Sequence, residues 1–202
     1  MNLDDTALIS AALAGDGRAM DRLLKNHYDR VYGVCRRITG NDADAADAAQ
    51  EALISVVRSL SKFDGRSSVA TWIYRIATNA SLDELRRRRR RPVAIIDEDP
   101  RQDHQHHDHP HHQTADPAAA PRVEAIADRM VLDAALAALP EDFRVPIVLR
   151  DVGDLDYAEI ADTLGIPVGT VKSRIARGRA ALAERLRDGN RSDNDRRQTP
   201  DS

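Results

Sequence analysis

A proline-containing, histidine-rich stretch in the middle of the chain limits the possible folds more than any other feature. Residues 93–125 show no apolar period, and they carry seven Asp and Glu against two Arg. Proline fixes φ and lacks a backbone donor, so neither a helix interior nor a central strand tolerates it. The prolines in or beside this stretch are Pro92, Pro100, Pro110, Pro117 and Pro121. We predict a flexible, acidic, His-rich linker over 93–122 that joins two modules, 1–92 and 123–188.

The first module has the periodicity of amphipathic helices and almost no β-type alternation. We expect helices over residues 5–14 and 20–38, a third from about residue 42, and a fourth from Val69 into an arginine run that Pro92 ends. The third helix is expected to bury Ala49, Leu53, Val56, Val57 and Leu60. The apolar face expected for the fourth is Val69, Ile73, Ile76 and Ala80.

The second module is also predicted to be helical, so the fold class is all-α. Its expected helices cover 126–139, 141–152, 157–164 and 168–186. Pro146 predicts a kink or a late start in the second of these helices. Residues 189–202 are expected to form a disordered tail.

Residues 156–171 have the organisation of a helix-turn-helix. Asp156 is placed to cap the first helix, and Glu159 three residues later completes a capping-box pattern. Gly165 suits the left-handed position of the turn, and Ile166 is expected to fill the angle between the helices. The order of cap, helix, turn and helix predicts a module that reads duplex DNA.

The second helix of this motif separates into two faces. Val171, Ile175, Gly178 and Leu182 fall on the side expected to pack on the module. The opposite side presents Thr170, Ser173, Arg174 and Arg177, and Lys172 and Arg179 lie on a flank suited to phosphate contact. An ordinary amphipathic helix with a solvated basic face is the alternative interpretation.

The first module combines aromatic rings with a block of cations. Phe63, Trp72 and Tyr74 are three of the chain's seven aromatic residues, and Arg86 begins six consecutive arginines that include Arg87. Rings beside a basic patch suit single-stranded nucleic acid, whose bases stack and whose backbone needs neutralising. Arg75, Asn79 and Asp83 add a polar stripe on which Asn79 is placed to bond the edge of an extruded base. The alternatives are a core role for Trp72 and a nonspecific electrostatic role for the arginines.

Asp47, Gln50 and Glu51 lie at i, i+3 and i+4 on the third expected helix, facing away from Leu53 and Val57. Such an acid-and-amide patch is either a solvated face or a surface on which a partner docks.

Four motifs together resemble the extracytoplasmic-function (ECF) sigma factors of the sigma-70 superfamily. They are DAAQEAL at 47–53, TWIYRIATNA at 71–80, LPEDFR at 139–144 and GTVKSR at 169–174. The resemblance implies a σ2-like module and a σ4-like module. It also implies docking of Asp47, Gln50 and Glu51 on the coiled coil of the polymerase β′ subunit.

The resemblance further implies what each module recognises. Residues matching Phe63 and Asn79 capture a flipped base of the −10 element, and the helix bearing Lys172, Ser173, Arg174 and Arg177 reads the −35 element as duplex. The implied partners are core RNA polymerase, through the β′ coiled coil and the β flap, promoter DNA and an anti-sigma protein. The linker is expected to thread near the polymerase active-site channel.

Several other classes of function are disfavoured. The chain has no Walker loop and no nucleophile motif, so we expect no enzyme, no cofactor and no structural metal site. The histidines of the linker, His104 to His112, are too densely spaced to define a tetrahedral site, which leaves a metal-handling protein as a weaker alternative. A plain helix-turn-helix regulator that never joins polymerase is the nearest rival.

The expected compartment is the cytoplasm, with no membrane insertion. No apolar run in the chain approaches the length of about 20 residues that a membrane span needs. The single cysteine, Cys35, excludes an internal disulfide and lies on an apolar helical stripe, which favours a core position over a redox sensor.

Overall fold

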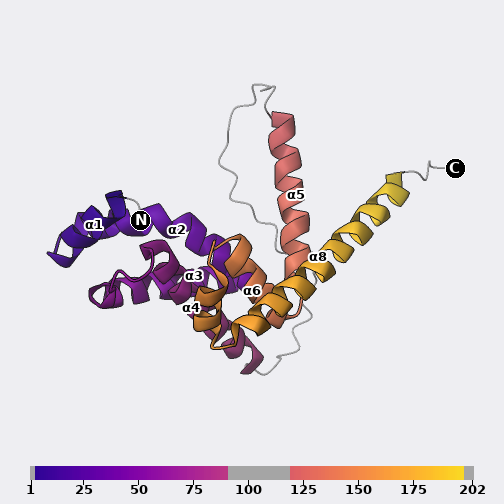
Figure 1. Cartoon of the computed structure of the whole chain (residues 1–202). Coiled ribbons are helices and arrows are strands. Elements are labelled where there is room, and N and C mark those ends of the chain that lie inside the picture. Colours follow the sequence, from indigo (N-terminus) through magenta and orange to yellow (C-terminus); the bar gives the residue numbers. More distant parts are fainter. Residues whose placement is uncertain (1–2, 91–118, 198–202) are drawn as a thin grey trace.

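The computed structural model describes residues 3–90 and 119–197, and all of its regular elements over these ranges are helices. This confirms the all-α fold class. The predicted linker over 93–122 falls almost entirely outside the described residues, and so do its histidines. Figure 1 shows an N-terminal bundle and a C-terminal group of helices from which α5 and α8 project.

The N-terminal module is built from α1 (Leu3–Leu13), α2 (Gly17–Thr39), α3 (Asp42–Ser59), the short 3₁₀ element η1 (Leu60–Lys62) and α4 (Val69–Arg90). Side-chain oxygens of Asp16 and Asn41 accept the first free N–H groups of α2 and α3. Gly40 ends α2 at φ 86°, a left-handed conformation that favours glycine. These short connections fold α2, α3 and α4 back on one another.

The core faces of α3 and α4 differ in detail from the prediction. Val57 is 46% exposed rather than buried, because the alanines of α3 at 45, 48, 49 and 52 face the bundle instead. In α4 the inward face carries Ile73, Tyr74, Ala77 and Leu85, whereas Ile76 and Ala80 are only half-buried. The inward side of α3 is therefore lined mainly by small alanines, together with Val56.

The C-terminal module consists of α5 (Ala119–Ala137), α6 (Glu141–Asp151), α7 (Tyr157–Leu164) and α8 (Val168–Arg197). Two of the expected helix bounds were wrong. Helix α5 begins before residue 123, with Pro121 in its first turn, where a missing N–H costs nothing. Helix α8 continues to Arg197 rather than ending near 186. Helix α6 begins at Glu141, which excludes a late start, and the kink at Pro146 stays a prediction.

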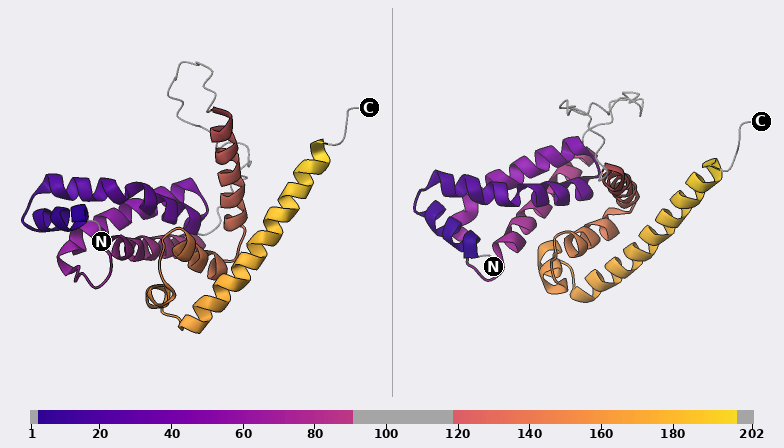
Figure 2. Two further views of the ribbon diagram at one scale, coloured as in Figure 1. Left: turned by 45° about the horizontal axis from the view of Figure 1, so that its top comes forward. Right: turned by 90° about the horizontal axis from the view of Figure 1, so that it is seen from above.

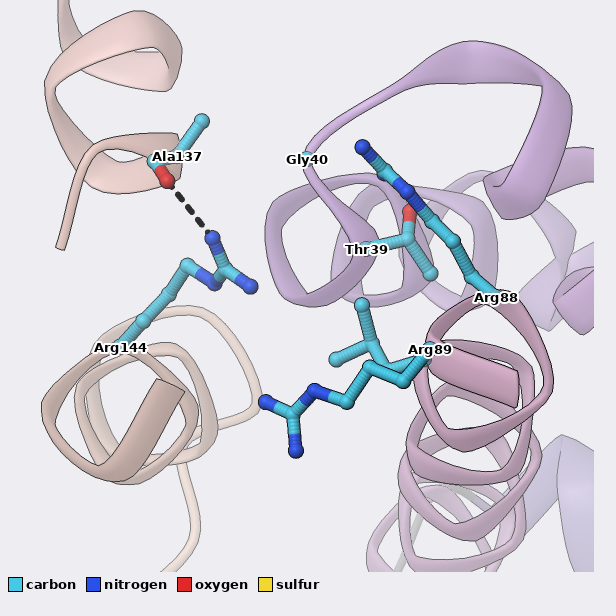
Figure 3. Close-up of a pocket in the computed structure, with 7 residues that line it drawn as sticks. Thr39, Gly40, Arg88, Arg89, Ala137 and Arg144 are labelled. Carbon is cyan, nitrogen blue, oxygen red and sulfur yellow. Dashed lines mark hydrogen bonds between the residues drawn. The ribbon is translucent and has the colours of Figure 1, made fainter. Parts of the chain in front are cut away.

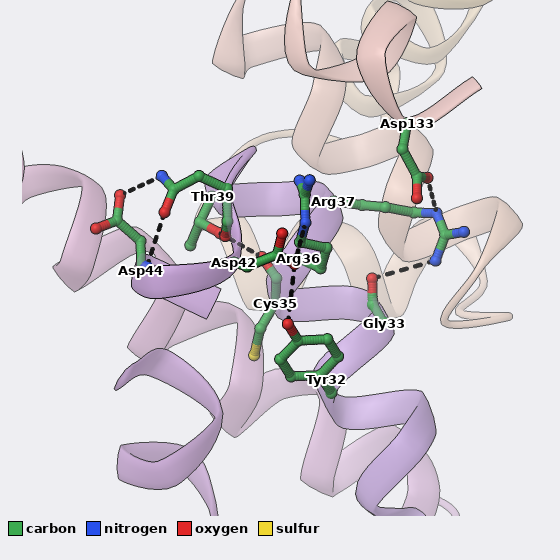
Figure 4. Close-up of polar contacts among 10 residues, drawn as sticks. Tyr32, Gly33, Cys35, Arg36, Arg37, Thr39, Asp42, Asp44 and Asp133 are labelled. Atoms are coloured by element: carbon green, nitrogen blue, oxygen red, sulfur yellow. Dashed lines mark hydrogen bonds and ion pairs between the residues drawn. The ribbon is translucent and has the colours of Figure 1, made fainter. Parts of the chain in front are cut away.

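The two modules contact each other. Helix α2 packs against α5 and α6, α4 touches α7, and the buried apolar residues of both modules form one continuous cluster. Both views in Figure 2 agree that the helix-turn-helix side of the C-terminal module lies beside the bundle. Arg37 Nε lies 3.0 Å from Asp133 Oδ1 across this junction, with the two side chains only 10% and 20% exposed. Figure 4 shows that Arg37 also donates to the Gly33 carbonyl of its own helix.

Candidate nucleic-acid interface

The helix-turn-helix has the local chemistry that the sequence predicts. The Asp156 carboxylate accepts the Glu159 N–H at 2.8 Å, and the Glu159 carboxylate accepts the Asp156 N–H at 2.9 Å. Gly165 has φ 64°, and the following Ile166 is half-buried against the core. A capped first helix and a left-handed turn therefore set the angle at which α8 leaves α7.

The inward face of α8 is confirmed. Val171 is 0% exposed and Ile175 is 2% exposed. Gly178 marks the closest approach to α6, because a Cβ at this position would lie 2.5 Å from Ile147 Cδ1 and 3.0 Å from Phe143 Cβ. With this side of α8 held on the module, the opposite side is left to solvent.

The outward face of α8 carries the residues expected to read duplex DNA. Ser173 and Arg177 are exposed, whereas Thr170 and Arg174 are half-buried. The Ser173 hydroxyl donates to the Thr170 carbonyl at 2.9 Å, and Arg174 Nη2 lies 3.3 Å from Asp142 Oδ1 on α6. The ion pair leaves Arg174 near the surface but partly neutralised.

The flanking cations also have partners inside the module. The guanidinium of Arg179 is held by both carboxylate oxygens of Asp151, and this partner raises the pKa of Arg179. Lys172 Nζ lies 5.6 Å from the centre of the Tyr157 ring, and the Arg150 guanidinium lies 5.3 Å from the same centre. The sequence reasoning missed these partners, since only the fold brings α6 and α7 beside α8.

The aromatic and polar residues expected to bind single-stranded DNA are partly brought together. The rings of Phe63 and Trp72 pack with their centres 5.4 Å apart, and both residues are half-buried against the core. Asn79 is exposed on α4, and Arg75 is half-buried. The same module therefore carries one exposed amide and two half-buried aromatic rings.

Tyr74 does not belong to that surface. Its residue is 2% exposed, and burial raises the pKa of its phenol while the charge of Arg30 opposes the rise. A ring enclosed by the bundle cannot stack on a base, so the assignment of Tyr74 to single-strand binding is corrected to a core role. Tyr74 precedes Arg75 by one residue, so its side chain points to a different side of α4 from the polar stripe of Arg75, Asn79 and Asp83.

The arginine run extends from the end of the N-terminal bundle. Arg86 and Arg87 pair with acids on their own helix, Asp83 at 2.7 Å and Glu84 at 2.9 Å. Arg88 Nη1 lies 3.2 Å from Asp44 on α3, and Arg89 Nη2 lies 2.6 Å from Glu141 on α6. All four arginines remain more than half exposed.

The acid-and-amide patch is on the outer side of α3. Asp47, Gln50 and Glu51 are all exposed, and the exposed side chain of Val57 lies further along the same face. The prediction that Val57 is buried had concealed this feature.

The remaining polar candidates are structural. Cys35 is 0% exposed, and burial raises the pKa of its thiol to about 11, so its core position is confirmed. Figure 4 places it beneath the polar end of α2, where Tyr32 and Arg36 both donate to Asp42. Within 3–90 and 119–197, no group of His, Cys, Asp and Glu is arranged to hold a metal ion. In the same ranges no helix has the length and apolarity to cross a membrane.

Family models match both modules. The model of sigma-70 region 2 matches residues 23–91, and that of sigma-70 region 4 matches residues 129–182. The first covers the helices that carry the aromatic residues and the acid-and-amide patch, and the second covers the helix-turn-helix. The two modules are those of a sigma-70-type initiation factor.

Curated relatives narrow the family further. The chain is 39% identical over 191 residues to the ECF RNA polymerase sigma factor SigE of Mycolicibacterium smegmatis, covering 90% of this chain and 67% of that protein. It is 33% identical to SigW of Bacillus subtilis, covering 86% and 92%, and 32% identical to the sigma-E factor of Escherichia coli, covering 91% and 95%. The chain belongs to the ECF sigma factor family.

Two solved structures share the fold. CnrH, in complex with the cytosolic domain of CnrY, has a TM-score of 0.59 at 24% identity and covers 92% of this chain and 98% of its own. The sigma factor RpoE of Bartonella quintana, in complex with the anti-sigma factor NepR, has a TM-score of 0.60 at 23% identity, covering 83% and 96%.

Membership of the family establishes the general function. Sigma factors are initiation factors rather than enzymes, and this one binds core RNA polymerase and directs promoter-specific transcription.

Proposed function

We propose that the two modules divide promoter recognition between duplex and single-stranded DNA. In the C-terminal module the outward face of α8 enters the major groove of the −35 element. There Thr170, Ser173, Arg174 and Arg177 face base edges, while Lys172 and Arg179 contact phosphates. The exposure of Ser173 and Arg177 beside a capped helix-turn-helix is the observation that carries this assignment.

The N-terminal module is proposed to hold the melted −10 element. Exposed Asn79 bonds the edge of a flipped base, while Phe63 and Trp72 form the wall beside it. Arg75, Arg86 and Arg87 neutralise the backbone of the captured strand. Strand separation is then offset by base capture and polymerase contacts rather than by ATP.

Asp47, Gln50 and Glu51 are proposed to dock on the β′ coiled coil of polymerase. Their shared exposure on one face of α3, together with exposed Val57, supports a protein contact. The C-terminal module is proposed to engage the β flap. In the closed arrangement all three polar docking residues are still open to solvent.

The contact between the modules must open when both promoter elements are bound. Elements centred near −35 and −10 are separated by about 25 base pairs, which is about 85 Å of duplex at 3.4 Å per base pair. In this structure α4 touches α7, so the two reading surfaces cannot span that distance. We infer that the free protein is closed and that polymerase holds it extended.

Regulation and location follow from the relatives. CnrH and the Bartonella RpoE were each solved with a bound protein, named as an anti-sigma factor in the second case. We infer that a comparable anti-sigma protein binds this chain, that the chain acts in the cytoplasm, and that it has no catalytic centre of its own.

Reconstitution with bacterial core polymerase tests the proposal. The substrate is the promoter upstream of the chain's own gene, and the variant carries Asp47→Ala, Gln50→Ala and Glu51→Ala. A matched control, Asp21→Ala with Asp29→Ala, removes the same number of negative charges from exposed positions on α2. Promoter-specific transcripts are expected with wild type and control but not with the triple variant. Specific duplex binding without any complex with core would contradict docking through α3.

A further inference from the structure

A cavity of about 530 Å³ lies at the junction of the two modules, where the ends of α2 and α4 meet α5 and α6. Figure 3 shows side chains reaching into it from both sides. Its lining includes Thr39, Leu85 and Ala137 together with three arginines, Arg88, Arg89 and Arg144. Neither promoter recognition nor polymerase docking uses this space.

Arg144 is the most enclosed of the three arginines. The residue is 8% exposed, and its Nη1 donates to the Ala137 carbonyl at 2.7 Å. Its Nε is buried and has no hydrogen-bond partner. A buried charged donor without an acceptor is costly, so an oxygen atom placed beside Arg144 Nε would stabilise the site.

The surroundings of Arg144 are also short of negative charge. Burial lowers the pKa of Arg144, Glu141 raises it, and the nearby charges of Arg88 and Arg89 lower it further. Arg88 and Arg89 are paired with Asp44 and Glu141, but their side chains are 60% and 67% exposed. The arginine ends of both pairs are open to solvent, and a guanidinium has N–H groups to spare for a further acceptor.

We propose that this cavity binds a phosphate-class anion, specifically the phosphoanhydride of inorganic pyrophosphate or of a nucleoside diphosphate. Guanidinium groups present forked N–H donors that match pairs of phosphate oxygens. Three of them line this space from two modules, which suits a group with several oxygens and more than one charge. The ligand would give the unpartnered Arg144 Nε an acceptor.

Binding there has a conformational consequence. The ligand contacts α4 of one module and α6 of the other, so it binds the closed arrangement and not an extended one. Any ligand that prefers one state shifts the population toward it. The anion therefore opposes the opening that simultaneous reading of both promoter elements demands.

Calorimetric titration of the full chain with inorganic pyrophosphate tests the site at constant ionic strength. GDP, guanosine and inorganic sulfate are titrated in parallel. The variants are Arg144→Gln and the exposed Arg89→Gln, with Arg66→Gln as a control that removes one arginine from an exposed loop. Thermal melts identify any loss of fold in Arg144→Gln, in which case Arg89→Gln carries the test.

One pyrophosphate per chain is expected, with affinity reduced about tenfold in Arg144→Gln and less in Arg89→Gln, and unchanged in Arg66→Gln. Binding of pyrophosphate alone would identify the free ion as the ligand, and binding of GDP but not guanosine would identify the nucleotide. Because the free protein is already closed, X-ray scattering should show no increase in the radius of gyration with ligand. Equal binding of sulfate, an equal loss in Arg66→Gln, or binding of single-stranded oligonucleotides only would overturn the proposal.

Discussion

Helices α4 and α8 both carry basic residues that we propose to contact nucleic acid, but the two helices neutralise those residues differently. In α4, Arg86 and Arg87 pair with acids three positions earlier on the same helix. In α8, Arg174 and Arg179 pair with Asp142 and Asp151, which belong to α6. The pairs of Arg86 and Arg87 need only the helix that carries them, whereas those of Arg174 and Arg179 depend on the crossing of α6 and α8. The state of the −35 surface is therefore tied to tertiary packing in a way that the −10 surface is not.

Breaking the α6–α8 crossing should have the largest effect. Gly178→Val places methyl groups where a Cβ already meets Ile147 at 2.5 Å. We expect about 3 kcal/mol of destabilisation by overpacking, measured by denaturant unfolding, and loss of −35 duplex binding. Gly169→Val is the control, because a Cβ there meets no atom within 4 Å. Equal stability of the two variants would contradict the close crossing.

Opening the junction between the modules should change the ion pairs of α4 but not those of α8. Asp133→Asn leaves the mostly buried Arg37 without its counter-charge, at a cost of about 2 to 4 kcal/mol to the closed state. Scattering should then report a larger radius of gyration, with α4 losing its Arg89–Glu141 pair but keeping those of Arg86 and Arg87. Asp128→Asn, an exposed change on the same helix, should leave the radius unaltered. An unaltered radius in Asp133→Asn would argue against the ion pair as a latch.

Removing the acidic partners on α6 should make the arginines of α8 more available to DNA. Asp142→Asn with Asp151→Asn frees Arg174 and Arg179 without touching a DNA-facing residue. Because these pairs are largely exposed, duplex affinity should rise only about two- to fivefold, with a steeper salt dependence. Fluorescence anisotropy with −35 duplexes provides the measurement, and Asp21→Asn with Asp29→Asn serves as the distant control. A fall in affinity would mean that the acids orient the arginines rather than mask them.

The smallest effect concerns the core of the N-terminal module. Since burial raises the pKa of Cys35 from 9.0 to about 11, native protein at pH 8 should resist alkylation, including the opened Asp133→Asn variant. The unfolded thiol loses its proton first, so this group's contribution to stability should decline as pH rises from 9.0 toward 11. Mass spectrometry of alkylated protein follows the first expectation. Rapid labelling of the opened variant would show that the bundle depends on the second module.

Much of the fold was predictable because its signals are local. Apolar periodicity, the Asp156–Glu159 capping box and the left-handed turn at Gly165 each act within a few residues, and each is present as expected. The outward positions of Ser173, Arg177, Asn79 and the α3 patch also follow from helical geometry. The errors fell where contacts between helices decide the outcome: Val57 is exposed because the alanines of α3 face the bundle, and Tyr74 is buried beside Arg30 of α2.

An all-α chain with two modules, and a family whose motifs are short and contiguous, can be inferred from local patterns of residues. The packing of the helices fixes which arginines are neutralised, by which acids, and how the two modules close on one another around Arg144. Ion pairs such as Arg37–Asp133 and Arg89–Glu141 join residues far apart along the chain. No local spacing specifies such pairs, because they form only after the packing of apolar surfaces has brought the helices together.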